Sequence, residues 1–169
     1  MTIVHEFDYH KPSTLQEALE LLGRYGGKAS VLAGGTDIVS WLRDEMVEPE
    51  ALVDLKGING LDQITTDEKS IHLGSLVTLN DLICSDAINE KLPLLVEAAH
   101  VFASTAVRNR ATIAGNICSA VPSCDSGPAL LVYEAIICVT GKNGDREISI
   151  VDWFLAPRKT SLAMDEIVT

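Results

Sequence analysis

The stretch Val31-Leu32-Ala33-Gly34-Gly35-Thr36-Asp37 decides how the first part of this chain folds. Apolar residues 30–33 predict a buried strand, the glycines predict a tight turn, and residues 38–42 predict the start of a helix. A glycine pair after a buried strand lets backbone N–H groups approach an anion, and Thr36 adds a hydroxyl donor. The alternative explanation for the glycine pair is a tight turn that needs positive φ and binds no ligand. The stretch matches neither G-x-G-x-x-G nor G-x-x-x-x-G-K-S/T, so it indicates neither an ordinary Rossmann site nor a P-loop.

Helical and strand-like segments alternate around this stretch. Thr14-Leu15-Gln16-Glu17 fits a capping box, and apolar residues then recur at helical spacing until Gly26-Gly27. Residues 51–55 form another short apolar run, which predicts a second buried strand. We therefore expect residues 1–56 to form a small α/β lobe with a partly parallel sheet.

The pattern changes at residue 57 and predicts a mixed α+β lobe over residues 57–169. Residues 70–74 alternate between polar and apolar, Thr78 and Asp81 open a helix, and a strongly apolar helix is predicted from Pro93 to Phe102. Asn143-Gly144 separates strands predicted at 135–140 and 146–150, as in a β-hairpin.

Composition excludes several classes of partner. The chain has 169 residues, of which 47% are hydrophobic, and a formal net charge of −11. Neutralising phosphates requires clustered Lys and Arg, so we expect no nucleic-acid partner. The chain contains no uninterrupted apolar run of about 18 residues and no basic, then apolar leader, so we expect a soluble, cytoplasmic protein without a membrane partner.

The cysteines do not predict a metal site in this chain. They occur at positions 84, 118, 124 and 138, without a C-x-x-C pair. An iron–sulfur cluster or zinc site formed by this chain alone is therefore not expected. Cys138 lies in an apolar run and is expected to be a small core residue.

A second segment combines small and hydrogen-bonding residues: Arg108-Asn109-Arg110-Ala111-Thr112-Ile113-Ala114-Gly115-Asn116-Ile117. Thr112 and Asn116 flank the Ala114-Gly115 pair, which lets a ligand approach the backbone closely. Asp125 offers a carboxylate acceptor for sugar or ribityl hydroxyls, although Asn and Asp in loops also cap turns. Together with the first glycine turn, this segment would form two walls around one extended ligand, which predicts a phosphate-containing cofactor with a polyol chain.

Four motifs together resemble one family. They are A-G-G-T-D at 33–37, R-N-x-A-T-I-x-G-N-I at 108–117, A-x-P-x-x-D-x-x-P-A-L at 120–130 and P-x-K-T-x-L-x-x-x-E-I at 157–167. From Phe7 to its end the chain resembles the FAD-binding medium subunits of molybdenum hydroxylases, such as xanthine, carbon monoxide and nicotinate dehydrogenases. The resemblance implies an α+β fold, a two-lobed PCMH-type FAD-binding domain with FAD between the lobes. That fold is similar to the flavin domain of vanillyl-alcohol oxidases and UDP-N-acetylenolpyruvylglucosamine reductases.

The resemblance also implies which residues bind the cofactor. Residues 30–37 would hold the pyrophosphate mostly through backbone, residues 111–116 would line the opposite side, and Asp125 would bond the polyol or ribose. Phe102 falls where family members can stack an aromatic ring on the adenine, although a core position at the end of the apolar helix explains it as well. Ile167 matches a position near the flavin. The implied residues are Ser30, Val31, Leu32, Ala33, Gly34, Gly35, Thr36, Asp37, Phe102, Ala111, Thr112, Ile113, Ala114, Gly115, Asn116, Asp125 and Ile167.

The sequence departs from the family pattern in three ways. Ala114 stands where a second glycine is usual, and its methyl would narrow the pocket. Residues 104–106, Ser-Thr-Ala, replace the commoner Gly or Ser, Pro, Gln. Family subunits usually continue into a small C-terminal domain, whereas this sequence ends at Thr169. We expect either a fragment or a short gene, with a more open FAD pocket.

By resemblance, the function is that of an oxidoreductase subunit whose chemistry resides in FAD, without a catalytic residue or metal ligand of its own. A large partner subunit with molybdopterin would hydroxylate the substrate, and a small partner subunit with [2Fe-2S] clusters would pass electrons to this FAD. The FAD would then reduce NAD⁺ or another acceptor. A xanthine dehydrogenase-like complex is favoured, with nicotinate, aldehyde and carbon monoxide open as substrates. The alternatives are a non-catalytic scaffold subunit that has lost flavin and a stand-alone flavoprotein oxidoreductase.

Overall fold

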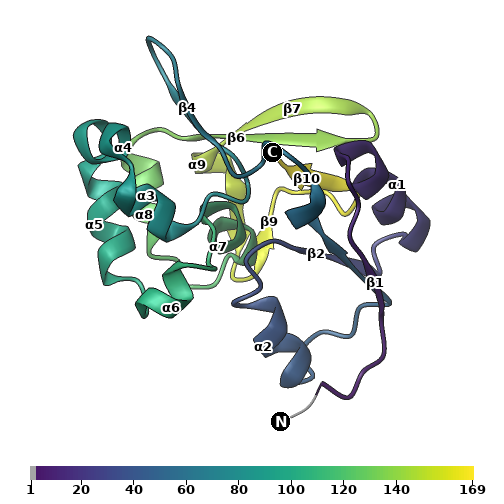
Figure 1. Ribbon diagram of the computed structural model, residues 1–169. Coiled ribbons are helices and arrows are strands. Elements are labelled where there is room, and N and C mark those ends of the chain that lie inside the picture. The colour runs from purple at the N-terminus through teal and green to yellow at the C-terminus, as the bar shows by residue number, and fades with distance from the viewer. Residues whose placement is uncertain (1–2) are drawn as a thin grey trace.

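The computed structural model describes residues 3–169 and has a mixed α+β fold, as the sequence predicts (Figure 1). Its first part is a parallel sheet with strand order β1-β3-β2. Helix α1 connects β1 to β2, and α2 connects β2 to β3. The bounds are β1 Asp8–His10, α1 Leu15–Tyr25, β2 Ala29–Leu32, α2 Ile38–Arg43 and β3 Ala51–Asp54.

Helix α1 begins and ends where the sequence predicts. The Thr14 hydroxyl accepts a hydrogen bond from the backbone N–H of Glu17, and Gly26 ends the helix in the left-handed conformation. The capping box is incomplete, because the Glu17 carboxylate accepts from the backbone N–H of Ser13 instead of returning to Thr14. The buried face of α1, Ala18, Leu19 and Leu22, packs with Val53 and Leu55 in one core cluster.

A buried carboxylate ends β3. Asp54 is 2% exposed and accepts hydrogen bonds from the Tyr9 hydroxyl and from the backbone N–H of Lys56, whose Nζ lies 2.7 Å from the carboxylate. Burial alone would raise the pKa of Asp54, but the bonds from Lys56 and Tyr9 outweigh it and hold the pKa below its ordinary value. The ionised form therefore stabilises the folded state.

This lowered pKa predicts a pH dependence of stability. Because its pKa is lowered in the folded state, Asp54 contributes to the free energy of unfolding. This contribution is complete above the ordinary aspartate pKa, about 3.9, and is lost as pH falls through the pKa of the folded state. We expect urea unfolding to give a higher free energy for the wild type than for Asp54→Asn at pH 6, with the difference shrinking below about pH 4. A difference that stays constant from pH 6 to pH 3 would contradict the assigned ionisation.

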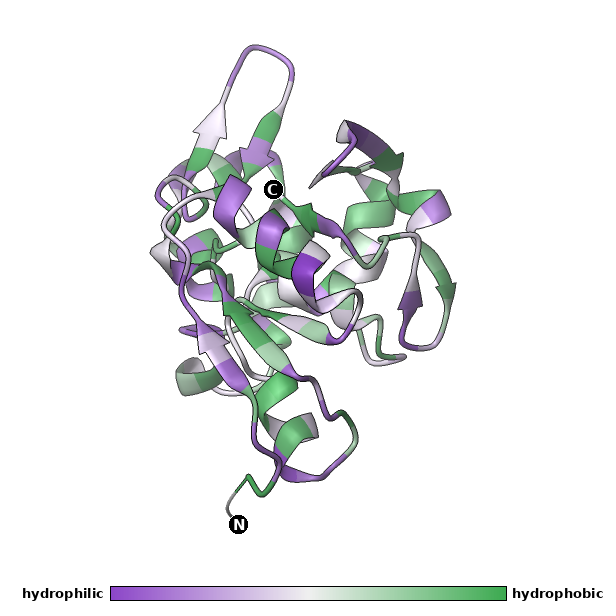
Figure 2. Ribbon diagram, turned by 90° about the vertical axis from the view of Figure 1, so that its right-hand side faces the viewer, coloured by the Kyte–Doolittle hydropathy of each residue, from purple (hydrophilic) through white to green (hydrophobic). Residues whose placement is uncertain are grey.

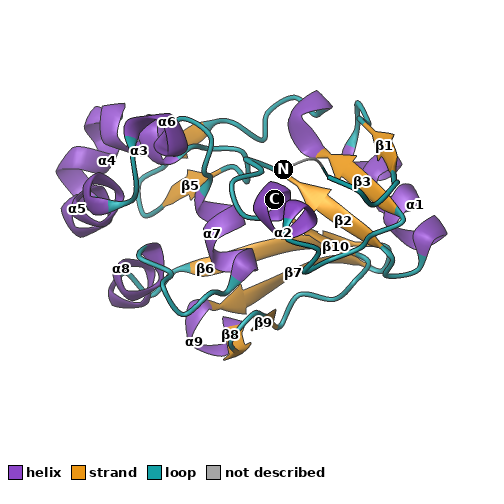
Figure 3. Ribbon diagram, turned by 90° about the horizontal axis from the view of Figure 1, so that it is seen from below, coloured by secondary structure: helices purple, strands orange, loops and turns teal. Residues whose placement is uncertain are grey.

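The second part of the chain contains a helical cluster and an antiparallel sheet of order β10-β6-β7 (Figure 3). The helices are η1 Leu55–Gly57, α3 Leu79–Cys84, α4 Asp86–Lys91, α5 Pro93–Val101, α6 Thr105–Arg108, α7 Ile113–Ser119, α8 Ser126–Val132 and α9 Ile150–Trp153. The strands are β4 Ile64–Thr66, β5 Ile71–Leu73, β6 Ile136–Gly141, β7 Gly144–Ser149, β8 Phe154–Ala156, β9 Lys159–Thr160 and β10 Glu166–Val168. β4 and β5 form a projecting hairpin whose loop is hydrophilic (Figure 2).

The predicted hairpin at residues 135–150 is present, with two corrections. The strands pair from Ile136–Ser149 to Gly141–Gly144, so the loop is Lys142-Asn143 and Gly144 already belongs to β7. Ile150 begins α9 instead of ending the strand, because the Ser149 side chain caps that helix. Cys138 is exposed and not a core residue, since strand alternation directs its neighbours Ile137 and Val139 inward.

The buried residues form two clusters, one in each part of the chain. The larger cluster is built mainly from α3, α5, α7 and the sheet of β6 and β7, around the fully buried Trp153. The smaller cluster lies between α1 and β3, and it includes Ile167 from β10. The last strand, β10, therefore pairs with β6, while the side chain of its residue Ile167 packs in the smaller cluster. The boundary between residues 56 and 57 stays a prediction, and residues 1 and 2 of the predicted lobe lie outside the described residues.

No helix within residues 3–169 has the length and apolarity needed to cross a membrane.

Candidate functional site

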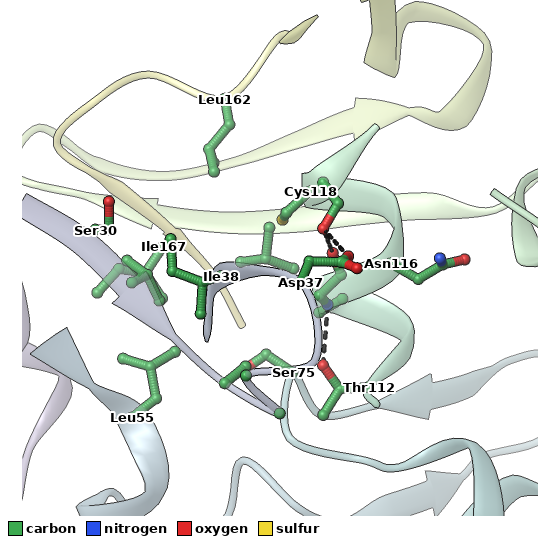
Figure 4. A pocket seen from close by; sticks show the side chains of 18 of the residues that line it. Ser30, Asp37, Ile38, Leu55, Ser75, Thr112, Asn116, Cys118, Leu162 and Ile167 are labelled. Carbon is green, nitrogen blue, oxygen red and sulfur yellow. Dashed lines mark hydrogen bonds between the residues drawn. The ribbon is translucent and has the colours of Figure 1, made fainter. Parts of the chain in front are cut away.

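A cavity of about 300 Å³ lies between the loop that follows β2, the helix α7 and the strand β10 (Figure 4). Residues 30–37 and residues 111–116 face this one cavity from opposite walls. The lining includes these predicted residues: Ser30, Val31, Ala33, Gly34, Gly35, Thr36, Asp37, Phe102, Ala111, Thr112, Ala114, Gly115, Asn116 and Ile167.

The two glycines of the first wall are needed for different reasons. A Cβ on Gly34 would lie 1.9 Å from the carbonyl oxygen of Arg110, so only glycine lets the two walls meet backbone to backbone. Gly35 has φ +84°, a conformation that other L-residues rarely adopt. Close backbone approach therefore requires glycine at position 34, and positive φ favours it at position 35.

Three backbone donors on this loop have no partner among the described residues. The carbonyl groups of Gly35 and Asp37 accept from Val39 and Trp41 at the start of α2, at 3.1 and 2.9 Å. No acceptor within residues 3–169 bonds to the backbone N–H of Gly35, Thr36 or Asp37. These N–H groups therefore remain available as hydrogen-bond donors, and successive backbone amides of this kind can bind an anion.

The hydrogen-bonding side chains of the second wall are engaged within the protein. Thr112 caps α7 by accepting from the backbone N–H of Gly115 at 2.9 Å. The Asn116 amide is directed away from the loop that follows β2 (Figure 4), and its Oδ1 accepts from the Ser126 hydroxyl at 2.6 Å. Thr112 thus caps the start of α7, whereas Asn116 links α7 to α8. The small residues Ala114 and Gly115 line the cavity beside them.

A hydrogen bond joins the two walls across the cavity. The Ser119 hydroxyl lies 2.5 Å from the Asp37 carboxylate and 2.8 Å from the carbonyl oxygen of Gly115. Ser119 therefore links the loop that follows β2 to the last turn of α7. This contact gives Asp37 a partner within the protein and orients its negative charge.

Three predicted residues do not line the cavity. Leu32, at the end of β2, is absent from the lining, and Ile113 is buried in the larger core cluster. Asp125 is exposed and its side chain makes no capping bond at the start of α8. Phe102 lines the cavity and also packs against the larger cluster, so its position is compatible with both a ligand contact and a core role. The cofactor-binding roles of all these residues stay predictions.

The structure adds lining residues that sequence reasoning missed, because they come from separate elements without a shared motif. Examples are Trp41 on α2, Ser75 in the loop before α3, and Cys118 and Ser119 on α7. Burial raises the pKa of the Cys118 thiol to about 12, so this wall carries a neutral thiol. The Trp41 ring is covered by the Arg158 guanidinium, whose carbon lies 5.0 Å from the ring centroid.

The charge of the cavity also constrains its ligand. Among the described residues, its lining contains no Lys or Arg and two acidic residues, Asp37 and Glu166. Glu166 is neutralised by Arg146, with contacts of 2.6 and 2.7 Å. A bound phosphate would therefore depend on backbone N–H groups. A glycine turn whose amides lack protein acceptors, opposite a wall of small residues, is suited to an anionic ligand such as a pyrophosphate.

The chain belongs to the family described as the FAD binding domain in molybdopterin dehydrogenase, whose model matches residues 5–169. It is 35% identical over 162 residues to the carbon monoxide dehydrogenase medium chain of Hydrogenophaga pseudoflava, covering 96% of this chain and 56% of that protein. It is also 35% identical over 161 residues to a xanthine dehydrogenase FAD-binding subunit of Escherichia coli O157:H7, covering 95% and 55%.

A solved structure gives the same result for the fold. Carbon monoxide dehydrogenase from Hydrogenophaga pseudoflava, in a form that lacks the Mo-pyranopterin moiety, superposes with a TM-score of 0.96 at 34% identity. The match covers 99% of this chain and 58% of that chain. This chain therefore spans a little over half the length of the relatives it matches.

Proposed function

We propose that this chain binds FAD in the cavity between β2 and α7 and serves as the flavin subunit of a molybdenum hydroxylase. The observation that carries the proposal is the loop of residues 33–37. The amides of Gly35, Thr36 and Asp37 have no acceptor among the described residues, and Gly34 touches the opposite wall. Because the lining offers no cationic side chain, these amides are the groups suited to the pyrophosphate.

The residues present fit FAD on two further grounds. Ser75 lines the cavity, and its buried hydroxyl has no hydrogen-bond partner among the described residues, so the wall holds an unsatisfied polar group that a bound molecule can satisfy. The rest of the wall is largely apolar or small, with Trp41, Phe102 and Leu162 available to cover aromatic rings.

When bound, FAD would supply the redox chemistry, because a flavin accepts electrons singly or in pairs. The protein residues bind and orient it. The amides of Gly35, Thr36 and Asp37 hold the pyrophosphate, Ser119 keeps the Asp37 carboxylate in place, and the apolar wall that includes Ile167 excludes water.

The partners and the overall reaction follow from the relatives. We propose a complex with a molybdopterin-binding large subunit and a small subunit that carries [2Fe-2S] clusters, and with NAD⁺ or another electron acceptor. A xanthine dehydrogenase-like activity is proposed for the complex, although carbon monoxide dehydrogenase and xanthine dehydrogenase subunits match this chain at the same 35% identity.

The visible absorption spectrum of the purified chain, before and after addition of FAD, tests the proposal. We expect the absorption bands of oxidised flavin to be retained after gel filtration, with FAD identified in the acid extract. A colourless protein that still assembles with the two partner subunits would support a scaffold role instead. Turnover of a small molecule without partners would support a stand-alone oxidoreductase.

The placement of the pyrophosphate predicts the effect of one substitution. Gly35→Val should lower FAD affinity at least about 100-fold, because a β-branched residue at positive φ distorts the loop that presents the amides. Ser104→Ala, at the exposed start of α6, is the matched control and should change affinity less than about threefold. Equal flavin retention by both variants after gel filtration would show that the loop is not the binding site.

A further inference from the structure

One buried hydroxyl in the cavity wall forms no hydrogen bond among the described residues. Ser75 is 2% exposed, and its Oγ has no hydrogen-bond partner within the described residues 3–169. Buried hydroxyl groups are nearly always bonded, so each exception requires an explanation. Serine in a loop commonly bonds to nearby backbone, and Ser75 does not.

The backbone around Ser75 is held in place by its neighbours. Gly74 donates to the carbonyl oxygen of Gln63 at 3.0 Å, and Leu76 donates to that of Leu61 at 2.7 Å. A Cβ on Gly74 would lie 2.2 Å from the same Leu61 oxygen, so this loop fits closely against residues 61–63. The position of Ser75 is therefore fixed, and only rotation about its χ1 bond remains to direct the hydroxyl.

We infer that Ser75 is a further FAD-binding residue, whose hydroxyl forms a hydrogen bond with a polar group of the bound cofactor. It reaches the cavity from the loop between β5 and α3, which belongs to neither of the two glycine-containing segments (Figure 4). The inference rests on the proposed function, because the partner that satisfies Ser75 is FAD. Its particular consequence is that the same hydroxyl is unfavourable without FAD and favourable with it.

This consequence gives opposite effects in two measurements on Ser75→Ala. The FAD dissociation constant, from flavin fluorescence, should rise about 3- to 10-fold, the equivalent of one hydrogen bond. The urea midpoint of the FAD-free variant should equal or exceed that of the wild type, since an unpaired buried hydroxyl has been removed. Ser75→Cys, with a weak donor of similar size, should also lose affinity.

Ser126→Ala is the matched control for the stability measurement. Ser126 is 3% exposed, does not line the cavity, and donates to Asn116 at 2.6 Å. Its removal should therefore lower the urea midpoint of the FAD-free protein. A similar fall in Ser75→Ala would show that Ser75 bonds within the protein, and unchanged FAD affinity in both Ser75 variants would equally overturn the inference. The wild type is titrated with FAD before any variant is compared. Failure of the wild type itself to bind FAD would refute the proposed function and not only the role of Ser75.

Discussion

Replacing Gly34 with alanine is expected to abolish FAD binding and to destabilise the fold by about 1–3 kcal/mol, the usual cost of forcing extra atoms into a packed region. The added Cβ would lie 1.9 Å from the Arg110 carbonyl oxygen and 3.2 Å from the Ala111 Cα. Both are backbone atoms, so no side-chain rotation relieves the contact. The loop of residues 33–37 and the start of α7 must then separate, and the amides that we propose to bind FAD move away from the opposite wall.

Gly23→Ala is the matched control for this substitution. Gly23 lies within α1, and no atom outside its own helix lies within 4 Å of a Cβ added there. Alanine in the middle of a helix should therefore stabilise the protein by about 0.5–1 kcal/mol. Urea unfolding and flavin retention are the two measurements. If Gly34→Ala retained both wild-type stability and FAD, the contact between the two walls would have no functional role.

Local sequence signals predicted the elements of this fold well. The helix after Thr14, the strand before Gly34 and the apolar helix from Pro93 all occur where caps, glycines and spacing indicate. The sequence does not predict which residues of the 135–139 strand are buried, because a continuous apolar run does not indicate which face of the strand is exposed. Cys138 was therefore assigned to the core, whereas it faces solvent.

The candidate site was predictable only where its residues lie in continuous motifs. The loop of residues 33–37 and residues 111–116 meet at Gly34, but the sequence does not reveal that Arg110 supplies the contact. Trp41 and Ser75 reach the cavity from α2 and from the loop before α3, and tertiary packing alone brings them there. Thr112 and Asn116 line the cavity and also form hydrogen bonds within the protein that shape its wall, and their contacts with a cofactor stay predictions.

This structural role of Asn116 makes Asn116→Ala the second substitution with a large expected effect. Asn116 is 6% exposed, and its Oδ1 accepts from Ser126 at both Oγ and the backbone N–H and from Cys124 Sγ at 3.2 Å. Truncation would leave the buried Ser126 hydroxyl without its acceptor, at a cost of about 1–3 kcal/mol. We expect the urea-derived free energy of unfolding to fall by at least that amount.

A double-mutant cycle with Ser126→Ala separates this loss of hydrogen bonding from the loss of side-chain volume. If the amide acts through Ser126, the double variant should be less destabilised than the sum of the single variants, with a coupling of about 1–2 kcal/mol. Asn89→Ala, which removes an exposed amide bonded only to the carbonyl groups of Ile83 and Ser85, should cost under about 1 kcal/mol. Additive effects at Asn116 and Ser126 would instead mean that the two side chains are not coupled, and the proposed role of their hydrogen bond in joining α7 to α8 would be wrong.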